Sequence, residues 1–92
     1  VRLKNAATGE KQEIVCDGIF VSVGREPGTR MIENQVVLDE NGYIIADEST
    51  KTNLRGVFAV GDIRTKALRQ IVTATADGAN AAYAVEEYLA NK

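Results

Sequence analysis

The chain has 92 residues, a formal net charge of −2 and no histidine, and 45% of its residues are hydrophobic. This length suits one small domain with a thin core, and the composition is ordinary for a soluble globular protein. The small negative charge, without a cluster of lysine or arginine, argues against nucleic acid or an anionic membrane surface as a partner. No apolar run approaches the roughly 20 residues that a membrane span needs.

The chain contains a single cysteine, Cys16, which excludes an internal disulfide, a Cys-x-x-Cys redox pair and a thiolate zinc site. Its neighbours Ile14 and Val15 are apolar, so we expect a small, inert and buried thiol. One unpaired thiol fits a cytoplasmic location. Because histidine is also missing, we assign no catalytic residue and no metal ligand to this chain.

The first 29 residues predict a hairpin, a strand and a linker. Residues 1–4, which alternate apolar and charged, and the short apolar run at 14–15 flank the polar loop 5–11, which is typical of a hairpin. Residues 18–23 are almost wholly apolar and predict a central strand. Residues 24–29 (Gly-Arg-Glu-Pro-Gly-Thr) contain two glycines and the only proline, which predicts a linker.

A second hairpin is predicted farther along the chain. After a short helical turn at 31–33, the apolar runs 36–38 and 43–46 flank Asn41-Gly42, the strongest short-range hairpin signal.

The stretch 56–62 (Gly-Val-Phe-Ala-Val-Gly-Asp) carries the main functional signal. Its four consecutive apolar residues, 57–60, predict a strand that is buried on both faces inside a parallel sheet. The strand would end at Gly61, where backbone or ligand can come close, and then present the carboxylate of Asp62. Ligands of open α/β sheets bind beyond the carboxyl ends of strands, so the pattern indicates half of a nucleotide-cofactor site. The alternative is an ordinary turn in which Asp62 caps the structure that follows.

A long alanine-rich helix is predicted from about residue 68 to residue 90. One helical face carries apolar and small residues at alternating spacings of three and four, namely Ile71, Thr75, Gly78, Ala82, Val85 and Leu89. We expect this face to pack. Gly78 costs about 1 kcal/mol of helix propensity relative to alanine, which indicates a close approach to a sheet or a cofactor. The first turn of such a helix has unpaired amides and a partial positive charge.

Residues 52–62 resemble the second FAD-binding motif of the two-dinucleotide-domain flavoprotein reductases. Arg69-Gln70-Ile71 resembles the Arg-Gln signature of the low-molecular-weight thioredoxin reductases and the related alkyl hydroperoxide reductase flavoproteins. The resemblance implies a three-layer α/β, FAD/NAD(P)-binding Rossmann-like fold, with FAD and NADPH as cofactors, a thioredoxin-like protein as partner, and a homodimer.

The resemblance also implies roles for particular residues in binding FAD. The acid Asp62, which follows Gly61, would hold the ribityl chain. Ile63 and the pair Gln70-Ile71 would offer backbone contacts, with the helix start aimed at the N1/O2 edge of the flavin. Arg69 would either add a fixed cation or hold the neighbouring loop.

The resemblance divides the chain into three parts: residues 1–23 match the C-terminal end of an NADPH-binding domain, residues 24–28 an interdomain linker, and residues 29–92 the C-terminal segment of an FAD-binding domain. The two Gly-x-Gly-x-x-Gly turns and the Cys-x-x-Cys pair of the family are missing. We therefore expect a C-terminal fragment of a low-molecular-weight thioredoxin reductase that is inactive by itself.

Two alternatives to a thioredoxin-disulfide reductase fragment stay open. The chain could be a non-catalytic module that assembles through an exposed sheet edge. It could also come from the flavoprotein of an alkyl hydroperoxide reductase system or from a ferredoxin- or flavin-linked relative.

Overall fold

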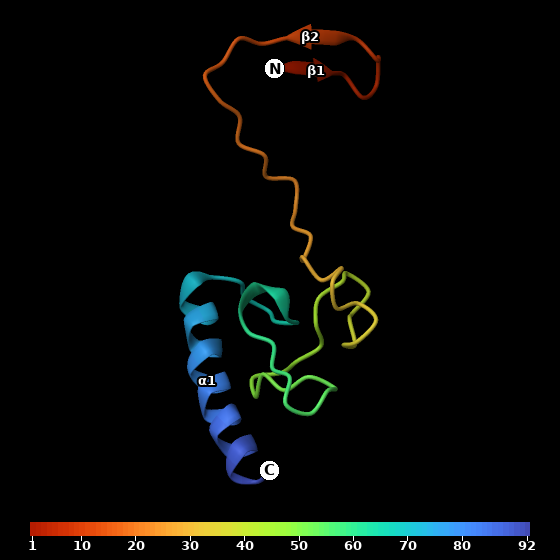
Figure 1. Ribbon diagram of the computed structural model, residues 1–92. Helices are drawn as coiled ribbons and strands as arrows, with labels where there is room; N and C mark the ends of the chain where they lie inside the picture. The colour runs from red at the N-terminus through yellow and green to blue at the C-terminus, as the bar shows by residue number, and fades with distance from the viewer.

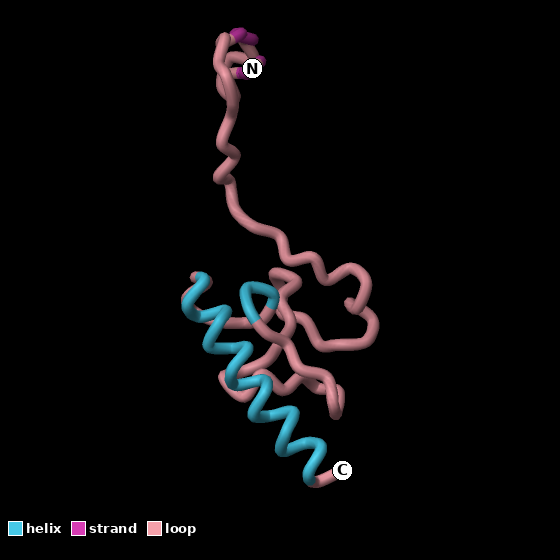
Figure 2. The backbone as a smooth tube through the Cα atoms, turned by 60° about the vertical axis from the view of Figure 1, so that its left-hand side comes forward, coloured by secondary structure: helices cyan, strands magenta, loops and turns pink.

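A small hairpin and a larger C-terminal body lie at opposite ends of an extended segment in the computed structural model, which describes residues 1–92 (Figure 1). The molecule measures 63 × 28 × 21 Å along its principal axes. Its named elements are strand β1 (Arg2–Lys4), strand β2 (Lys11–Glu13), the 3-10 turn η1 (Gly61–Ile63) and helix α1 (Ile71–Ala90). The tube in Figure 2 shows that loops make up most of the body beside α1.

The N-terminal hairpin is confirmed, with its second strand slightly earlier than predicted. Strands β1 and β2 pair antiparallel, with Arg2 opposite Glu13 and Lys4 opposite Lys11. The side chains of Arg2 and Glu13 also form an exposed ion pair at 2.8 Å. An exposed pair of this kind contributes at most about 1 kcal/mol, so the hairpin depends mainly on its backbone ladder.

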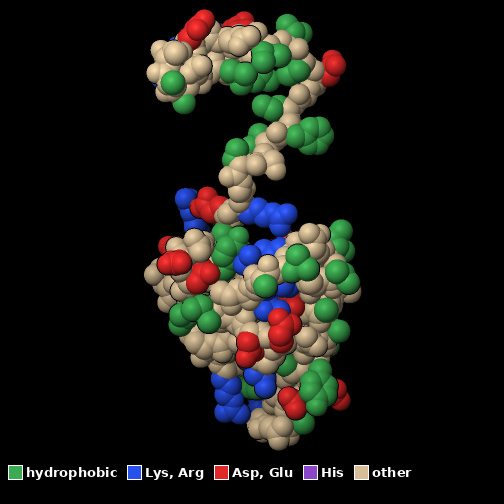
Figure 3. Space-filling model, turned by 180° about the vertical axis from the view of Figure 1, so that it is seen from behind, with side chains coloured by type: hydrophobic (Ala, Val, Ile, Leu, Met, Phe, Trp, Pro, Cys, Tyr) green, Lys and Arg blue, Asp and Glu red, His purple; other side chains and the backbone are tan.

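The prediction of a central strand at residues 18–23 is wrong for this chain. Residues 15–24 form no backbone hydrogen bond, and the Phe20 side chain is fully exposed. A strand needs a neighbour to satisfy its amides and carbonyls, and no other part of this chain lies beside the segment (Figures 1 and 2). Cys16 is exposed for the same reason, contrary to the expectation of a buried thiol. Hydrophobic side chains stand out along the segment in Figure 3.

The core of the body forms around the second hairpin. Val36, Ile44, Ala46 and Ala59 are buried together, and Ile32, Leu38, Leu54 and Ile63 pack against them. Leu38 and Ile44 form an antiparallel bridge on either side of the Asn41-Gly42 turn, so the predicted hairpin is confirmed. Gly42 has φ of +85°, a conformation that glycine adopts without steric cost.

The segment 57–60 differs from its prediction as a strand buried on both faces. It is extended and forms one antiparallel bridge, between Phe58 and Lys51. Ala59 is buried, whereas Val57 and Val60 are each 41% exposed. Burial on both faces requires cover on both sides and a parallel partner, and within this chain only Ala59 is fully buried, while Phe58 is half-buried against Tyr88. The predicted end of the segment at Gly61 is confirmed, because η1 begins there.

Helix α1 begins three residues later than predicted, and it packs on a different face. Gln70 is its N-cap, and the Gln70 amide donates to Thr73 Oγ1 at 3.0 Å. Asp77 and Ala84 are its buried residues, whereas Ile71 is 87% exposed. The prediction of the packing face is therefore wrong within this chain. The buried ion pair of Asp77 turns the face with Asp77 and Ala84, and not the face with Ile71, toward the rest of the body.

Gly78 lies on the exposed face of α1, and a Cβ there would meet no atom within 4 Å. The predicted close approach at Gly78 is thus not made by any part of this chain. No helix of the protein combines the length and the apolar character that crossing a bilayer requires.

Thr50 is the one non-glycine residue with positive φ, at 63°, and it is fully buried. Its hydroxyl has no hydrogen-bond partner. The left-handed region costs an L-residue roughly 1–2 kcal/mol relative to glycine. We expect Thr50→Gly to be more stable than Thr50→Ala by about 1 kcal/mol, the reverse of the usual order of glycine and alanine.

Urea unfolding of the two Thr50 variants measures this difference. Gly78→Ala, in the middle of α1 where φ is helical, is the matched control, and there alanine should be favoured by about 1 kcal/mol. Equal stabilities of Thr50→Gly and Thr50→Ala would contradict a backbone cost at this position.

Candidate functional site

The turn η1 presents the candidate acid. Gly61 leaves the extended segment with φ of +77°, a conformation that favours glycine. Asp62 follows at the centre of the turn, and its side chain is 52% exposed. The hydrophobic run 57–60 is therefore followed by a sharp turn that holds the Asp62 carboxylate at the surface, and this part of the prediction is confirmed.

A buried ion cluster fixes the start of this turn to helix α1. Asp77 Oδ2 accepts hydrogen bonds from the Gly61 amide, from Arg64 Nε and from Lys66 Nζ, each at 2.8 Å. Asp77 Oδ1 accepts a further bond from Arg64 Nη2 at 2.6 Å. The side chains of Arg64, Lys66 and Asp77 are 1%, 4% and 2% exposed. One carboxylate thus joins the helix to the turn through both a backbone amide and two cations.

The guanidinium of Arg64 reaches further and joins the second hairpin to the same cluster. Its Nη1 donates to the carbonyls of Ala46 and Thr65, at 3.2 and 2.9 Å, and its Nη2 donates to Glu48 Oε1 at 3.0 Å. The hydrogen bonds between Arg64 and Asp77 lower the pKa of the carboxyl and raise the pKa of the guanidinium, outweighing the opposite effect of burial. Both groups therefore stay charged at neutral pH.

Arg69 fixes the other side of the turn. Its Nε donates to the carbonyl of Asp62 and its Nη2 donates to the carbonyl of Arg64, both at 3.0 Å. Its guanidinium also lies over the ring of Tyr43, with the Cζ atom 3.8 Å from the ring centroid. Of the two roles considered for Arg69, the contacts are those of a residue that holds the neighbouring loop.

Two adjoining hollows, each of about 240 Å³, bring the candidate residues together. Arg25, Asp62 and Arg69 line both hollows. Ile63 and Tyr43 also line the first hollow, and Gln70, Ile71 and Ala74 also line the second. The predicted acid and the predicted helix start therefore face the same space, with Gly61 directly before the acid.

Sequence reasoning missed Arg25 and Asp77 as members of the site. Arg25 belongs to the predicted linker, and its Nη1 lies 3.3 Å from Asp62 Oδ2. Nothing in the local pattern could have located that contact. Asp77 did carry a signal, because it is the only charged residue between Arg69 and Glu86. A lone carboxylate in an apolar helix is expected to be buried only with a cationic partner.

The arrangement fits the ribityl chain and the ring edge of a flavin. The first helical hydrogen bond of α1 runs from the Ala74 amide to the Gln70 carbonyl at 3.0 Å, so the amides of residues 71–73 have no partner within the helix. Of these three residues, Ile71 borders the same hollow as the half-exposed Asp62 acceptor. An acceptor for hydroxyl groups beside the unpaired amides of a helix start is an arrangement typical of nucleotide-cofactor sites in α/β proteins.

Comparison with known proteins places the chain in a family. The family model described as pyridine nucleotide-disulphide oxidoreductase matches residues 2–78. The chain belongs to this family. It is 52% identical over 92 residues to a thioredoxin reductase of Peptoclostridium litorale, covering 94% of this chain and 29% of that protein. It is 45% identical over 89 residues to thioredoxin reductase of Bacillus subtilis strain 168, covering 97% and 28%.

Solved structures agree with this assignment and confirm the fold class. Thioredoxin reductase of Lactococcus lactis, in a crystal structure titled as the FR conformation, matches with a TM-score of 0.80 and 42% identity, covering 99% of this chain and 30% of that one. The thioredoxin reductase of Streptococcus pyogenes MGAS5005 matches with a TM-score of 0.77 and 40% identity, covering 99% and 30%. The chain thus spans less than a third of the length of these relatives.

The buried ion pair makes a large contribution that a single substitution removes. Asp77→Asn keeps the shape of the side chain but leaves the buried Arg64 guanidinium without its buried counter-ion, and such a change costs roughly 3–5 kcal/mol. Glu48→Gln is the matched control, because it removes the exposed partner of the same guanidinium and should cost at most about 1 kcal/mol. Urea unfolding followed by circular dichroism compares them, and equal losses would contradict this division.

The pKa of Asp77 also predicts a pH dependence of stability. Because its native pKa lies well below the usual 3.8, the unfolded chain takes up a proton at this position before the native chain does. The stabilising contribution is therefore complete above about pH 4 and is lost as the pH falls below it. Carboxyl-carbon NMR should find Asp77 still ionised at about pH 3. Half-protonation of Asp77 near its usual value would contradict the ion pair.

Proposed function

We propose that this chain forms the ribityl and ring-edge part of the FAD site in an NADPH-dependent thioredoxin-disulfide reductase. The observation that carries the proposal is that Asp62 and the start of α1 border one hollow. The reductase names of the relatives, at 45–52% identity, support the class of reaction. In that reaction electrons would pass from NADPH through FAD to a disulfide.

Each residue at the hollow has a binding or orienting role in this proposal. The carboxylate of Asp62 accepts hydrogen bonds from ribityl hydroxyls, and it exchanges its weak contact with Arg25 for them. The helix start at Gln70-Ile71 faces the N1/O2 edge of the ring, where its partial positive charge favours negative charge. The Ile71 amide is free to donate there, whereas the Gln70 amide would exchange its bond with Thr73 Oγ1 for the contact. Ile63 adds a backbone contact beside the acid. Bound FAD supplies the hydride and electron transfer, while these residues bind it and adjust its electronic properties.

The domain division proposed for the longer protein follows the same logic. Residues 1–23 would complete an NADPH-binding domain, residues 24–28 would link the domains, and residues 29–92 would close the FAD-binding domain. The separation of the hairpin from the body supports a boundary in this region (Figure 1). The exposed side chains of Phe20 and Ile71 support a further polypeptide that covers them. We therefore propose that the 92 residues alone do not catalyse the reaction.

The partners of the proposed enzyme rest on the relatives and on the sequence motifs. Proteins named thioredoxin reductase act on thioredoxin, which supports a thioredoxin-like protein as the acceptor. A homodimer and a cytoplasmic location rest on the motif resemblance and on the single unpaired Cys16.

A chimera tests the proposed flavin site. Residues 1–92 would replace the matching segment of the P. litorale thioredoxin reductase, to which they are 52% identical. We expect the purified chimera to retain FAD and NADPH-dependent thioredoxin reduction. A chimera that folds, as judged by circular dichroism and a cooperative thermal transition, but retains no FAD would contradict the proposal.

The role of Asp62 is tested in the same chimera. Asp62→Ala removes the charged acceptor, so we expect the dissociation constant for FAD to rise roughly 10- to 100-fold. Glu33→Ala is the control, since Glu33 is exposed and forms no ion pair. Flavin absorbance and fluorescence titration of the apoprotein measure the effect. Equal affinity in the two variants would remove Asp62 from the site while leaving the site itself in place.

A further inference from the structure

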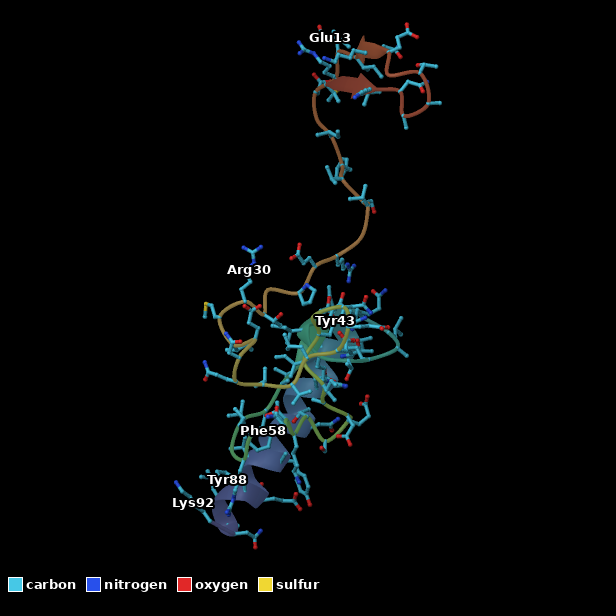
Figure 4. The ribbon with its side chains drawn as sticks, turned by 90° about the vertical axis from the view of Figure 1, so that its right-hand side faces the viewer. Glu13, Arg30, Tyr43, Phe58, Tyr88 and Lys92 are labelled. Carbon is cyan, nitrogen blue, oxygen red and sulfur yellow. The ribbon has the colours of Figure 1, made fainter.

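We propose that Tyr43 is a positioning residue of the flavin site and acts through Arg69 on the turn that carries Asp62. The inference rests on the proposed function and adds to it a residue from a different part of the chain. Tyr43 belongs to the second hairpin, whereas Arg69 directly precedes the helix start and Asp62 lies on η1. Figure 4 shows Tyr43 at the end of the body where η1 and the start of α1 meet.

The contact between Tyr43 and Arg69 adds to the two hydrogen bonds of the guanidinium. The donors of Arg69 bond the carbonyls of Asp62 and Arg64, both at 3.0 Å. Arg69 Cζ also lies over the Tyr43 ring, 3.8 Å from the ring centroid. This distance is well within the roughly 6 Å over which a cation and an aromatic ring attract. The ring therefore gives the guanidinium a third contact that helps to hold it in place.

Tyr43 is itself held rigidly, which allows it to set the position of another side chain. Its amide donates to Asp39 Oδ1 at 2.9 Å, and its carbonyl accepts from the Asp39 amide at 2.8 Å. The next residue, Ile44, is buried, and its amide donates to the carbonyl of Ile63 at 2.9 Å. The backbone at Tyr43-Ile44 is thus tied directly to η1, which fixes the point from which the ring projects.

The same contacts make Tyr43 a wall of the first hollow, together with Asp62, Ile63 and Arg69. A guanidinium released from the ring could swing into this hollow or leave the carbonyl of Asp62. Either movement would alter the direction of the Asp62 carboxylate. The expected consequence is weaker retention of the ribityl chain, with no loss of a group that touches it directly.

The chain contains a matched pair away from the hollow. Arg55 lies over the ring of Tyr88, 5.6 Å from its centroid, and Tyr88 also packs edge-on against Phe58 at 6.3 Å. This second pair lies toward the C-terminal end of α1 (Figure 4). Tyr88→Leu therefore makes the same chemical change, in a comparable setting, without touching the proposed site.

The experiment uses the chimera with the P. litorale reductase and measures FAD affinity in four variants. Tyr43→Leu and Tyr43→Met each remove the aromatic face, and we expect a roughly 3- to 10-fold rise in the dissociation constant. Tyr43→Phe keeps the ring and should restore affinity to within about 2-fold of the parent chimera. Tyr88→Leu should leave affinity unchanged. The fluorescence of the bound flavin gives an independent readout, which we expect to change in Tyr43→Leu and to return in Tyr43→Phe.

A double-mutant cycle tests whether Tyr43 acts through Arg69. In an Arg69→Met background, Tyr43→Leu should weaken FAD binding no further. Additive effects would overturn the inference, as would FAD affinity in Tyr43→Leu and Tyr43→Met equal to that of the parent. If Tyr43→Leu and Tyr43→Met both fail to fold while Tyr88→Leu folds, the role of Tyr43 is purely structural, and the inference is also overturned.

The proposed function and the inference fail in different ways. If the parent chimera folds and binds no FAD, the proposed function fails before any variant is compared. If the parent chimera binds FAD and Tyr43→Leu binds it equally well, the flavin site stands and only the role of Tyr43 is lost.

Discussion

The ion pair between Arg64 and Asp77 is the interaction on which the rest of the body depends. Only nine residues of the chain are buried, and five of these are hydrophobic, so apolar packing alone provides a small core. The pair joins α1, which contributes no residue to the core cluster, to η1 and the second hairpin. Removing two charges from water is costly, and here four hydrogen bonds to the Asp77 carboxylate offset that cost. Polar geometry thus fixes the relative positions of the elements.

The candidate site depends on the same pair. The amide of Gly61 and the carbonyls at 62 and 64 are held from opposite sides, by Asp77 and by Arg69. A three-residue turn has few internal hydrogen bonds of its own, so these external bonds define its conformation. The carboxylate of Asp62 takes no part in them; it lies at the edge of the hollow, half-exposed, with the exposed Arg25 guanidinium 3.3 Å away. Rigid support behind a half-exposed acceptor suits the binding of a polyhydroxyl chain.

Local features could be predicted from the sequence, and features that depend on distant partners could not. The hairpin at Asn41-Gly42 and the start of α1 follow from turn chemistry and helical periodicity, which act within a few residues. The meeting of Asp62 with the helix start was implied by the resemblance of residues 52–62 and 69–71 to the family's motifs. The predictions of buried strands at 18–23 and 57–60 were wrong for this chain, because burial on two faces needs neighbouring strands or helices that these 92 residues do not supply. The roles of Arg25 and Tyr43 depend on side chains that folding brings together from distant parts of the chain, so no local sequence pattern predicts them.

The helix face illustrates why an apolar pattern and a packing face can differ. Spacing selects the stripe through Ile71 and Leu89, and both residues are exposed, at 87% and 59%. The face that packs on this chain instead contains Asp77 and Ala84, which the ion pair and the small core require. We infer that α1 divides its contacts by chemistry. Its polar anchor holds the helix to the turn that carries the site, and its apolar stripe stays exposed on this chain. An apolar stripe therefore predicts only that a helix packs against something. A buried charge with a fixed counter-ion identifies the face that packs against the chain's own residues.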